Sequence, residues 1–167
     1  MESAHATIER FEGHSLNRTA IIKQYEAMAS SILHSQSPIL PNAAAVFAFF
    51  PALVGFVGLF QPRLVLAGAF EFELPSAPTD QKLVDSLMRL FCVRDLFLGG
   101  VALAAWYNEE KKTLGAIMLL GAGVVFTDGA VNKHQTGQGA WKHWTFVPVM
   151  ASVGAGLLGW LDGLVAA

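Results

Sequence analysis

Charge and cysteine are scarce in this chain of 167 residues. Acidic and basic residues make up 14% of it, whereas about a quarter of the residues in a typical soluble domain are charged. The net charge of −2, without a cluster of basic residues, provides no field that would attract nucleic acid. The one cysteine, Cys92, excludes an internal disulfide. These shortages exclude a disulfide framework and a nucleic-acid partner, and they are unusual for a soluble domain.

Motifs of common metal and nucleotide sites are also missing. His134 and His143 lie nine residues apart in a polar loop, without the HExxH-like spacing or the cysteine cluster of a zinc site. The glycines at 121 and 123 lack the strand, turn and helix that surround a phosphate-binding loop. We therefore expect neither a metal nor another cofactor.

Apolar residues dominate what is present, at 53% of the chain. Four segments have the length and apolar character of membrane-spanning helices, at about 39–60, 84–107, 113–131 and 144–165. The sequence therefore predicts one all-α domain over 38–167, an integral membrane four-helix bundle. We expect a multi-pass protein of the endoplasmic reticulum or another endomembrane, with membrane lipid as a partner. A homo-oligomer is compatible with this pattern.

The connecting segments differ in length and character. NEEKK at 108–112 allows only a tight antiparallel hairpin between the second and third helices. The segment 61–82 is longer, contains three prolines, and has an apolar half suited to the membrane surface. Residues 1–37 are polar and lack the order of a cleavable signal peptide. Within them, 16–36 has apolar residues at helical spacing, which predicts an amphipathic helix on the membrane surface, with a frayed tail as the alternative.

Two adjacent charges, Arg94 and Asp95, interrupt the apolar stretch FCVRDLFLGGVALAAWY at 91–107. A charge at the centre of a spanning helix costs about 2.5–3.5 kcal/mol on insertion scales, so it usually faces the bundle interior and has a partner. Asp85 and Arg89 lie four residues apart on the same predicted helix, and we expect them to pair with each other.

Hairpin geometry predicts a partner for Asp95. Asp95 precedes Glu110, at the centre of the turn, by 15 residues, and Asp128 follows it by 18. At about 1.5 Å per residue their depths differ by only about 5 Å. We expect both carboxylates to line one cavity, with Arg94 reaching it more readily than Arg89. Arg94 and Asp95 point about 100° apart on the helix, so Arg94 must bend to do so.

Matching by depth along the helices also predicts that Asn132, His143 and Trp144 lie at the mouth of this cavity. Arg89, which with Arg94 brackets Asp128 in depth, is a further candidate for substrate binding. Intramembrane ion pairs also occur as devices that only fix helix register. One pair suffices for that purpose, whereas several polar groups converge here, which favours a functional site.

Three motifs resemble a group of small fungal integral membrane proteins that share a domain of unknown function and recur in polyketide gene clusters. They are RDLFLGG at 94–100, TLGAIMLLGAGVVFTDGAVNKH at 113–134 and GAWKHWTFVPV at 139–149. The resemblance covers about residues 40–165. The matching positions are Arg94, Asp95, Gly99, Asp128, Gly129 and His143.

This resemblance implies a function, because some such proteins are assigned as epoxide hydrolases or cyclases. It implies that a lipophilic polyketide-type epoxide is opened by acid–base catalysis, with Asp95 and Asp128 as base and acid in either order and Arg94 between them. Soluble limonene-epoxide hydrolases use an Asp–Arg–Asp arrangement on an unrelated fold, which is a chemical analogy only. Two alternatives stay open: a non-catalytic membrane scaffold or lipophile carrier, and a double-bond isomerase that uses the same carboxylates.

Overall fold

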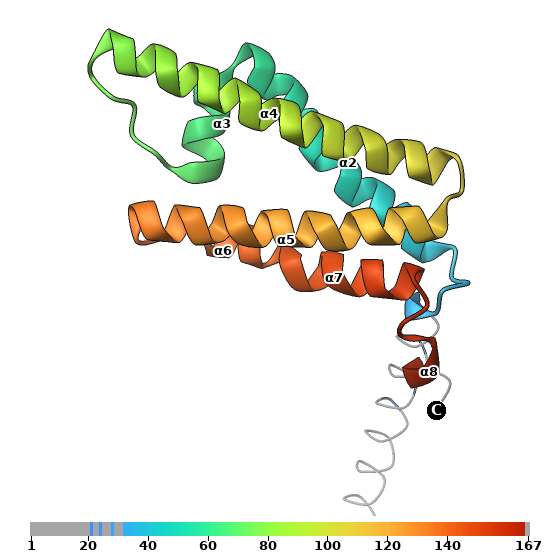
Figure 1. Ribbon diagram of the computed structural model, residues 1–167. Helices are drawn as coiled ribbons and strands as arrows, with labels where there is room; N and C mark the ends of the chain where they lie inside the picture. Colours follow the sequence, from blue (N-terminus) through green and yellow to red (C-terminus); the bar gives the residue numbers. More distant parts are fainter. Residues whose placement is uncertain (1–20, 22–23, 25–27, 29–31, 166–167) are drawn as a thin grey trace, which may run out of the picture.

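The computed structural model describes residues 21, 24, 28 and 32–165, and all regular secondary structure in this part of the chain is helical (Figure 1). The longer helices are α2 (Ile39–Phe60), α4 (Pro78–Tyr107), α5 (Lys111–Thr136) and α7 (Phe146–Leu157). The short ones are α3 (Pro62–Val65), the π-helix η1 (Leu66–Phe70), α6 (Trp141–Trp144) and α8 (Asp162–Val165). The prediction of an all-helical fold is confirmed. The predicted helix at 16–36 falls largely outside the described residues.

The helix boundaries follow local backbone chemistry. The observed α2 has the predicted bounds, and α4 begins earlier than predicted, at Pro78, because proline is well suited to the first turn of a helix. Gly137, with a φ of 76°, ends α5. The helix predicted over 144–165 is interrupted instead: α7 ends at Leu157, and Gly159 adopts a φ of 76° in the turn that follows.

The long helices form two pairs, α2 with α4 and α5 with α7, and the pairs lie one above the other in Figure 1. α4 and α5 are joined by a short turn but contact each other far less than the partners within each pair do. One buried cluster, which includes Ala44, Ala102, Met118 and Val153, joins all four helices. The core therefore holds the two pairs together while leaving α4 and α5 partly separated.

Glycines permit the close approach within each pair. A Cβ atom on Gly99 of α4 would lie 2.5 Å from the carbonyl oxygen of Ala48, and one on Gly55 of α2 would lie 2.4 Å from the amide nitrogen of Leu96. Small residues are the usual means of close helix contact in membranes. α2 and α5 are also long and apolar enough to cross one.

Candidate functional site

Arg94 connects two carboxylates from neighbouring helices, and we name these three residues the Asp–Arg–Asp unit. Asp95 lies beside Arg94 on α4, and Asp128 lies on α5. The Arg94 Nη2 atom is 2.9 Å from Asp95 Oδ1 and 2.9 Å from Asp128 Oδ2. Two further hydrogen bonds run from Arg94 Nε to Asp95 Oδ1 (3.0 Å) and from Nη1 to Asp128 Oδ1 (3.2 Å). The structure thus brings together the three residues that the depth argument selected.

An aromatic ring supports the guanidinium group. The Cζ atom of Arg94 lies 4.0 Å from the centroid of the Phe91 ring, which is the geometry of a cation–π contact. Phe91 precedes Arg94 by three residues, so both side chains lie on one side of α4. Sequence reasoning missed Phe91, although this spacing was a usable signal. The contact holds Arg94 in the bent position that the bridge requires.

The two carboxylates are engaged differently. Both oxygens of Asp128 accept hydrogen bonds from Arg94, whereas Asp95 accepts only through Oδ1. No described residue donates to Asp95 Oδ2. Both aspartate side chains are 15% exposed and Arg94 is 37% exposed. One carboxylate is therefore fully held by the arginine, and the other has a free oxygen.

A cavity of ≈ 520 Å³ adjoins the unit and is lined by α2, η1, α4, α5, α6 and α7. Its ionisable lining residues are Asp95, Asp128, Lys142 and His143, and the rest of the wall is apolar or glycine. Arg94 is not part of the wall and holds the carboxylates from outside it. The volume lies within the range of about 300–1,000 Å³ that small-molecule sites occupy.

Of the predicted lining residues outside the unit, His143 reaches the cavity. Its Nε2 atom lies 3.2 Å from the carbonyl oxygen of Ala69. Trp144 instead stacks on Phe126 at 5.7 Å and donates from Nε1 to the carbonyl oxygen of that residue (3.1 Å). Trp144 therefore packs against α5 and is not part of the cavity wall. The prediction that it lines the cavity is not supported by its position.

Asn132 also lies away from the cavity wall, fully buried near the end of α5. Its Oδ1 atom lies 3.3 Å from the Thr136 hydroxyl oxygen, and its Nδ2 atom has no partner among the described residues. A Cβ atom on Gly139 would lie 2.6 Å from this Nδ2 atom. Asn132 therefore packs under the α5–α6 turn and does not face a ligand site.

The segment of α3 and η1 closes one end of the cavity. Glu71, which follows η1, forms an ion pair with Lys142 of α6. Phe70 lies 5.0 Å from Phe91 and 5.5 Å from the His143 ring, measured between ring centroids. Sequence reasoning missed Lys142 and Phe70. The sequence carries no signal for these contacts, because they join two connecting segments far apart in the chain.

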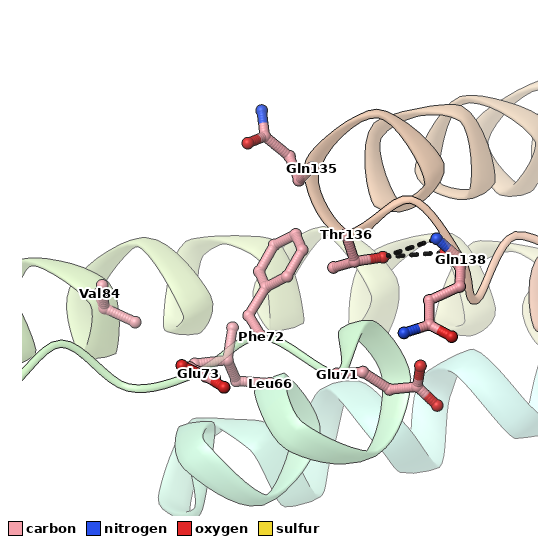
Figure 2. A pocket seen from close by; sticks show the side chains of 8 residues that line it. All are labelled: Leu66, Glu71, Phe72, Glu73, Val84, Gln135, Thr136 and Gln138. Atoms are coloured by element: carbon pink, nitrogen blue, oxygen red, sulfur yellow. Dashed lines mark hydrogen bonds between the residues drawn. The ribbon is translucent and has the colours of Figure 1, made fainter.

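A second hollow, of ≈ 540 Å³, lies outside this closed end (Figure 2). Its wall includes Glu71 and Glu73 on one side and Gln135, Thr136 and Gln138 on the other. The Thr136 hydroxyl donates to the Gln138 carbonyl (2.9 Å) and accepts from the Gln138 amide (3.3 Å). In this hollow the Thr136 hydroxyl is therefore engaged by the Gln138 backbone, and Glu71 is paired with Lys142.

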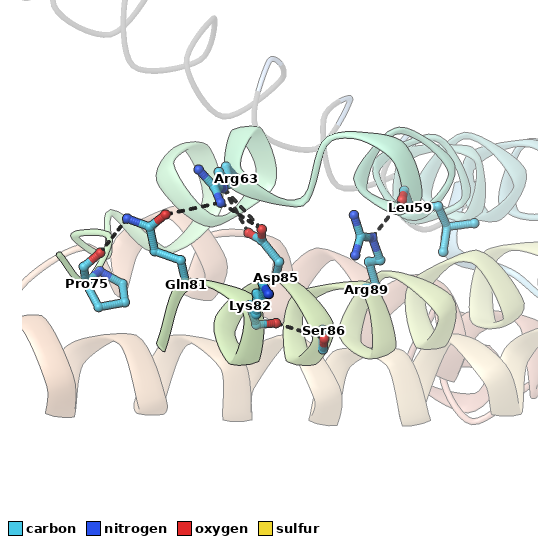
Figure 3. A network of polar contacts seen from close by, with 8 residues as sticks. All are labelled: Leu59, Arg63, Pro75, Gln81, Lys82, Asp85, Ser86 and Arg89. Atoms are coloured by element: carbon cyan, nitrogen blue, oxygen red, sulfur yellow. Dashed lines mark hydrogen bonds and ion pairs between the residues drawn. The ribbon is translucent and has the colours of Figure 1, made fainter. Parts of the chain in front are cut away.

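Arg89 and Asp85 belong to neither cavity, and the prediction that they pair with each other is wrong (Figure 3). Asp85 accepts from Arg63, with Nη2 to Oδ2 at 2.9 Å and Nε to Oδ1 at 3.0 Å. This interaction raises the pKa of the Arg63 guanidinium. Arg89 donates to the carbonyl oxygen of Leu59 at 3.2 Å, near the end of α2, where carbonyl groups lack helical partners. Arg89 is therefore a structural cap for α2.

The chemistry offered by the site is that of paired carboxyl groups and an imidazole. Within the described part of the chain, no three His, Cys, Asp or Glu side chains gather in a way that would hold a metal ion. Fold and site together define an all-helical protein with an Asp–Arg–Asp unit at one end of an apolar cavity.

The family follows from a comparison of the sequence. A family model described as a domain of unknown function (DUF4267) matches residues 48–157, and the chain belongs to this family. The matched range contains the whole Asp–Arg–Asp unit and His143. No curated protein and no solved structure matches the chain. The prediction of a shared domain of unknown function is confirmed.

Proposed function

We propose that this protein is a membrane-embedded four-helix enzyme that opens a lipophilic epoxide by acid–base catalysis. The observation that carries the proposal is the Asp–Arg–Asp unit, which presents two differently bonded carboxyl groups to a cavity with a mostly apolar wall. Two carboxyl groups in unequal states supply a base and an acid at once. An apolar wall selects a substrate with little polarity beyond its reacting group.

The outer surface supports a membrane location. Only 22% of the most apolar stretch of α2 and 28% of that of α5 is buried inside the protein. Large apolar side chains point outward on all four long helices, among them Phe49, Phe97, Leu120 and Val149. A soluble monomer rarely exposes contiguous apolar surface of this extent. In a bilayer, lipid chains would cover this apolar surface and keep it from water.

The asymmetry of the unit supports one assignment of the two roles. Asp128 accepts from arginine at both oxygens, a charge-assisted pairing typical of a carboxylate, so we assign it the role of the base. Asp95 has a free oxygen, Oδ2, which carries a proton toward the cavity and acts as the acid. Arg94 touches both carboxylates but does not line the cavity, so it is a positioning residue. His143 contributes a polar group to the cavity wall.

The reaction then balances in one step. Water attacks an epoxide carbon and forms a new C–O bond while the existing bond from that carbon to the epoxide oxygen breaks. Asp128 takes the proton that the water loses, and Asp95 gives its proton to the epoxide oxygen, which yields a diol. Proton transfer from Asp128 to Asp95 through solvent restores the enzyme. When a hydroxyl group of the substrate attacks instead of water, the product is a cyclic ether.

The test uses the full chain in lipid nanodiscs with a long-chain terminal epoxide, hexadecene oxide, in heavy-oxygen water. We expect the protein to form a diol that contains one heavy oxygen, and Asp95→Asn and Asp128→Asn to abolish its formation. Asp85→Asn is the matched control, because Asp85 pairs with Arg63 outside the cavity. It should leave turnover unchanged.

Other outcomes point to other functions. Full activity of both Asp95→Asn and Asp128→Asn in folded protein would contradict the mechanism. Deuterium uptake from deuterated water into an unsaturated lipophile, without added oxygen, would indicate a double-bond isomerase. A folded protein that binds hexadecene oxide without converting it, and that also leaves an epoxide with an internal hydroxyl group unchanged, would indicate a lipophile carrier.

A further inference from the structure

Part of the cavity wall is also part of the outer surface. Val46 and Phe50 of α2 and Phe146 of α7 line the cavity, yet they are 72%, 64% and 46% exposed. The rings of Phe50 and Phe146 stack at 6.4 Å between centroids and bridge the two helices. α2 and α7 otherwise make few contacts with each other. A single layer of apolar side chains therefore separates the cavity from the surroundings on this side.

The polar end of the cavity is closed more firmly. There the ion pair of Glu71 with Lys142 and the hydrogen bond of His143 to the Ala69 carbonyl join η1 to α6. The Phe70 ring is packed between this junction and α4. A ligand that entered from water at this end would have to break these polar contacts. A ligand that entered between α2 and α7 would only require apolar side chains to change rotamer.

The charges of the cavity select against an anion. The Arg94 guanidinium makes four hydrogen bonds to Asp95 and Asp128, so its charge is already matched by a carboxylate of the unit. The ammonium group of Lys142 is paired with Glu71. No cation of the described cavity wall is free to receive a carboxylate or a phosphate, so the occupant has a neutral head group.

We infer that the cavity is filled from the side, through a portal formed by Val46, Phe50 and Phe146, by a neutral lipophile dissolved in the bilayer. This inference rests on the proposed membrane location and deepens the proposed function, because it names the route and the charge class of the substrate. Fatty-acid-like anions are excluded as substrates, and uncharged epoxides of the same length are accepted.

The experiment plugs the portal with a bulky label. Phe50→Cys is labelled with pyrene maleimide in nanodiscs, and Val46→Cys gives a second plug in case the first variant does not fold. The native Cys92 is fully buried and does not compete for the reagent. The matched control is labelled Phe56→Cys, because Phe56 is 56% exposed on the same helix and does not line the cavity.

The readout is photo-crosslinking with a diazirine-bearing hexadecanol, which is neutral, followed by peptide mapping. We expect adducts on the cavity wall at Ile117 and Met118, reduced several-fold by the plug at position 50 and unchanged by the label at position 56. The corresponding diazirine-bearing carboxylate should give several-fold fewer adducts. Equal labelling with plugs at 50 and 56, equal labelling by the anion, or no adducts on the wall would overturn the inference.

Turnover of hexadecene oxide on the same samples separates this inference from the proposed reaction. Turnover that persists unchanged with the portal plugged contradicts the portal and leaves the reaction standing. Crosslinking that depends on the portal, without any turnover, supports the portal and contradicts the reaction.

Discussion

Helix α4 meets its two long neighbours in opposite ways. Against α2 it presents Gly99, whose missing side chain lets the two backbones touch. Against α5 it presents Asp95, and the helices stay apart around a cavity, while Arg94 bridges the two helices from outside the cavity wall. The first contact is filled and apolar, and the second is hollow and held by charge. Gly99 touches the α2 backbone and also borders the cavity, so close packing against α2 and the hollow toward α5 meet at one position of the same helix.

We expect the largest effect on stability at the filled contact between α2 and α4. Gly99→Leu places a Cβ atom 2.5 Å from the Ala48 carbonyl oxygen, so backbone must move, and we expect a loss of about 3 kcal/mol in the free energy of unfolding. The adjacent Gly100 has no atom within 4 Å of an added Cβ. Gly100→Leu should therefore be neutral or stabilise by about 0.5–1 kcal/mol.

Denaturant unfolding in detergent, followed by circular dichroism, checks this pair of variants. Because the two glycines are consecutive, helix propensity and expression changes affect both alike. Equal destabilisation by both substitutions would show that α2 and α4 are not in backbone contact.

A smaller effect is expected at the hollow contact. Arg94→Met removes the bridge and leaves Asp95 and Asp128 facing each other. Loss of one partner from a buried ion pair costs about 3–5 kcal/mol, but Arg94 is partly exposed, and solvent screening reduces the expected loss to about 1–2 kcal/mol. The control Arg63→Met breaks the exposed pair with Asp85 and should cost less than about 1 kcal/mol. The same unfolding measurement applies.

A second substitution in the Arg94→Met variant tests why the free energy of unfolding falls. If the loss in Arg94→Met comes from two uncompensated carboxylates, adding Asp128→Asn should recover part of it. A double variant that is less stable than Arg94→Met would mean that the arginine acts through its packing on Phe91 and not through charge.

The two contacts also differ in how far the sequence predicts them. The rise per residue along a hairpin sets depth, and depth alone was enough to match Asp95 with Asp128. Depth says nothing about rotation around the helix axis, which is why Trp144 was expected at the cavity and lies outside it. The pairing of Glu71 with Lys142 depends on how the 61–77 segment folds back, and no periodicity in the sequence encodes that path.

The smallest expected effect on stability lies at a glycine of the hollow region. Gly68 of η1 lines the cavity, and a Cβ atom added to it has nothing within 4 Å. Gly68→Leu should change the free energy of unfolding by no more than about 0.5 kcal/mol. It should nevertheless narrow the cavity and raise the KM for hexadecene oxide several-fold, with little change for the smaller styrene oxide. Gly123→Leu, also in open space but outside the cavity wall, should change neither KM.

Gly68→Leu distinguishes a glycine that only borders the cavity from one that packs against a neighbouring helix, because the free energy of unfolding and the KM are measured independently. Gly99 borders the cavity and touches the α2 backbone, so its enlargement should cost stability whatever the substrate. Gly68 borders the cavity without a neighbour within 4 Å, so its enlargement should lower only the affinity for large substrates. Should Gly68→Leu instead destabilise the protein and leave the KM unchanged, η1 would be a packing element like α2, and the contrast between the two sides of α4 would not extend to it.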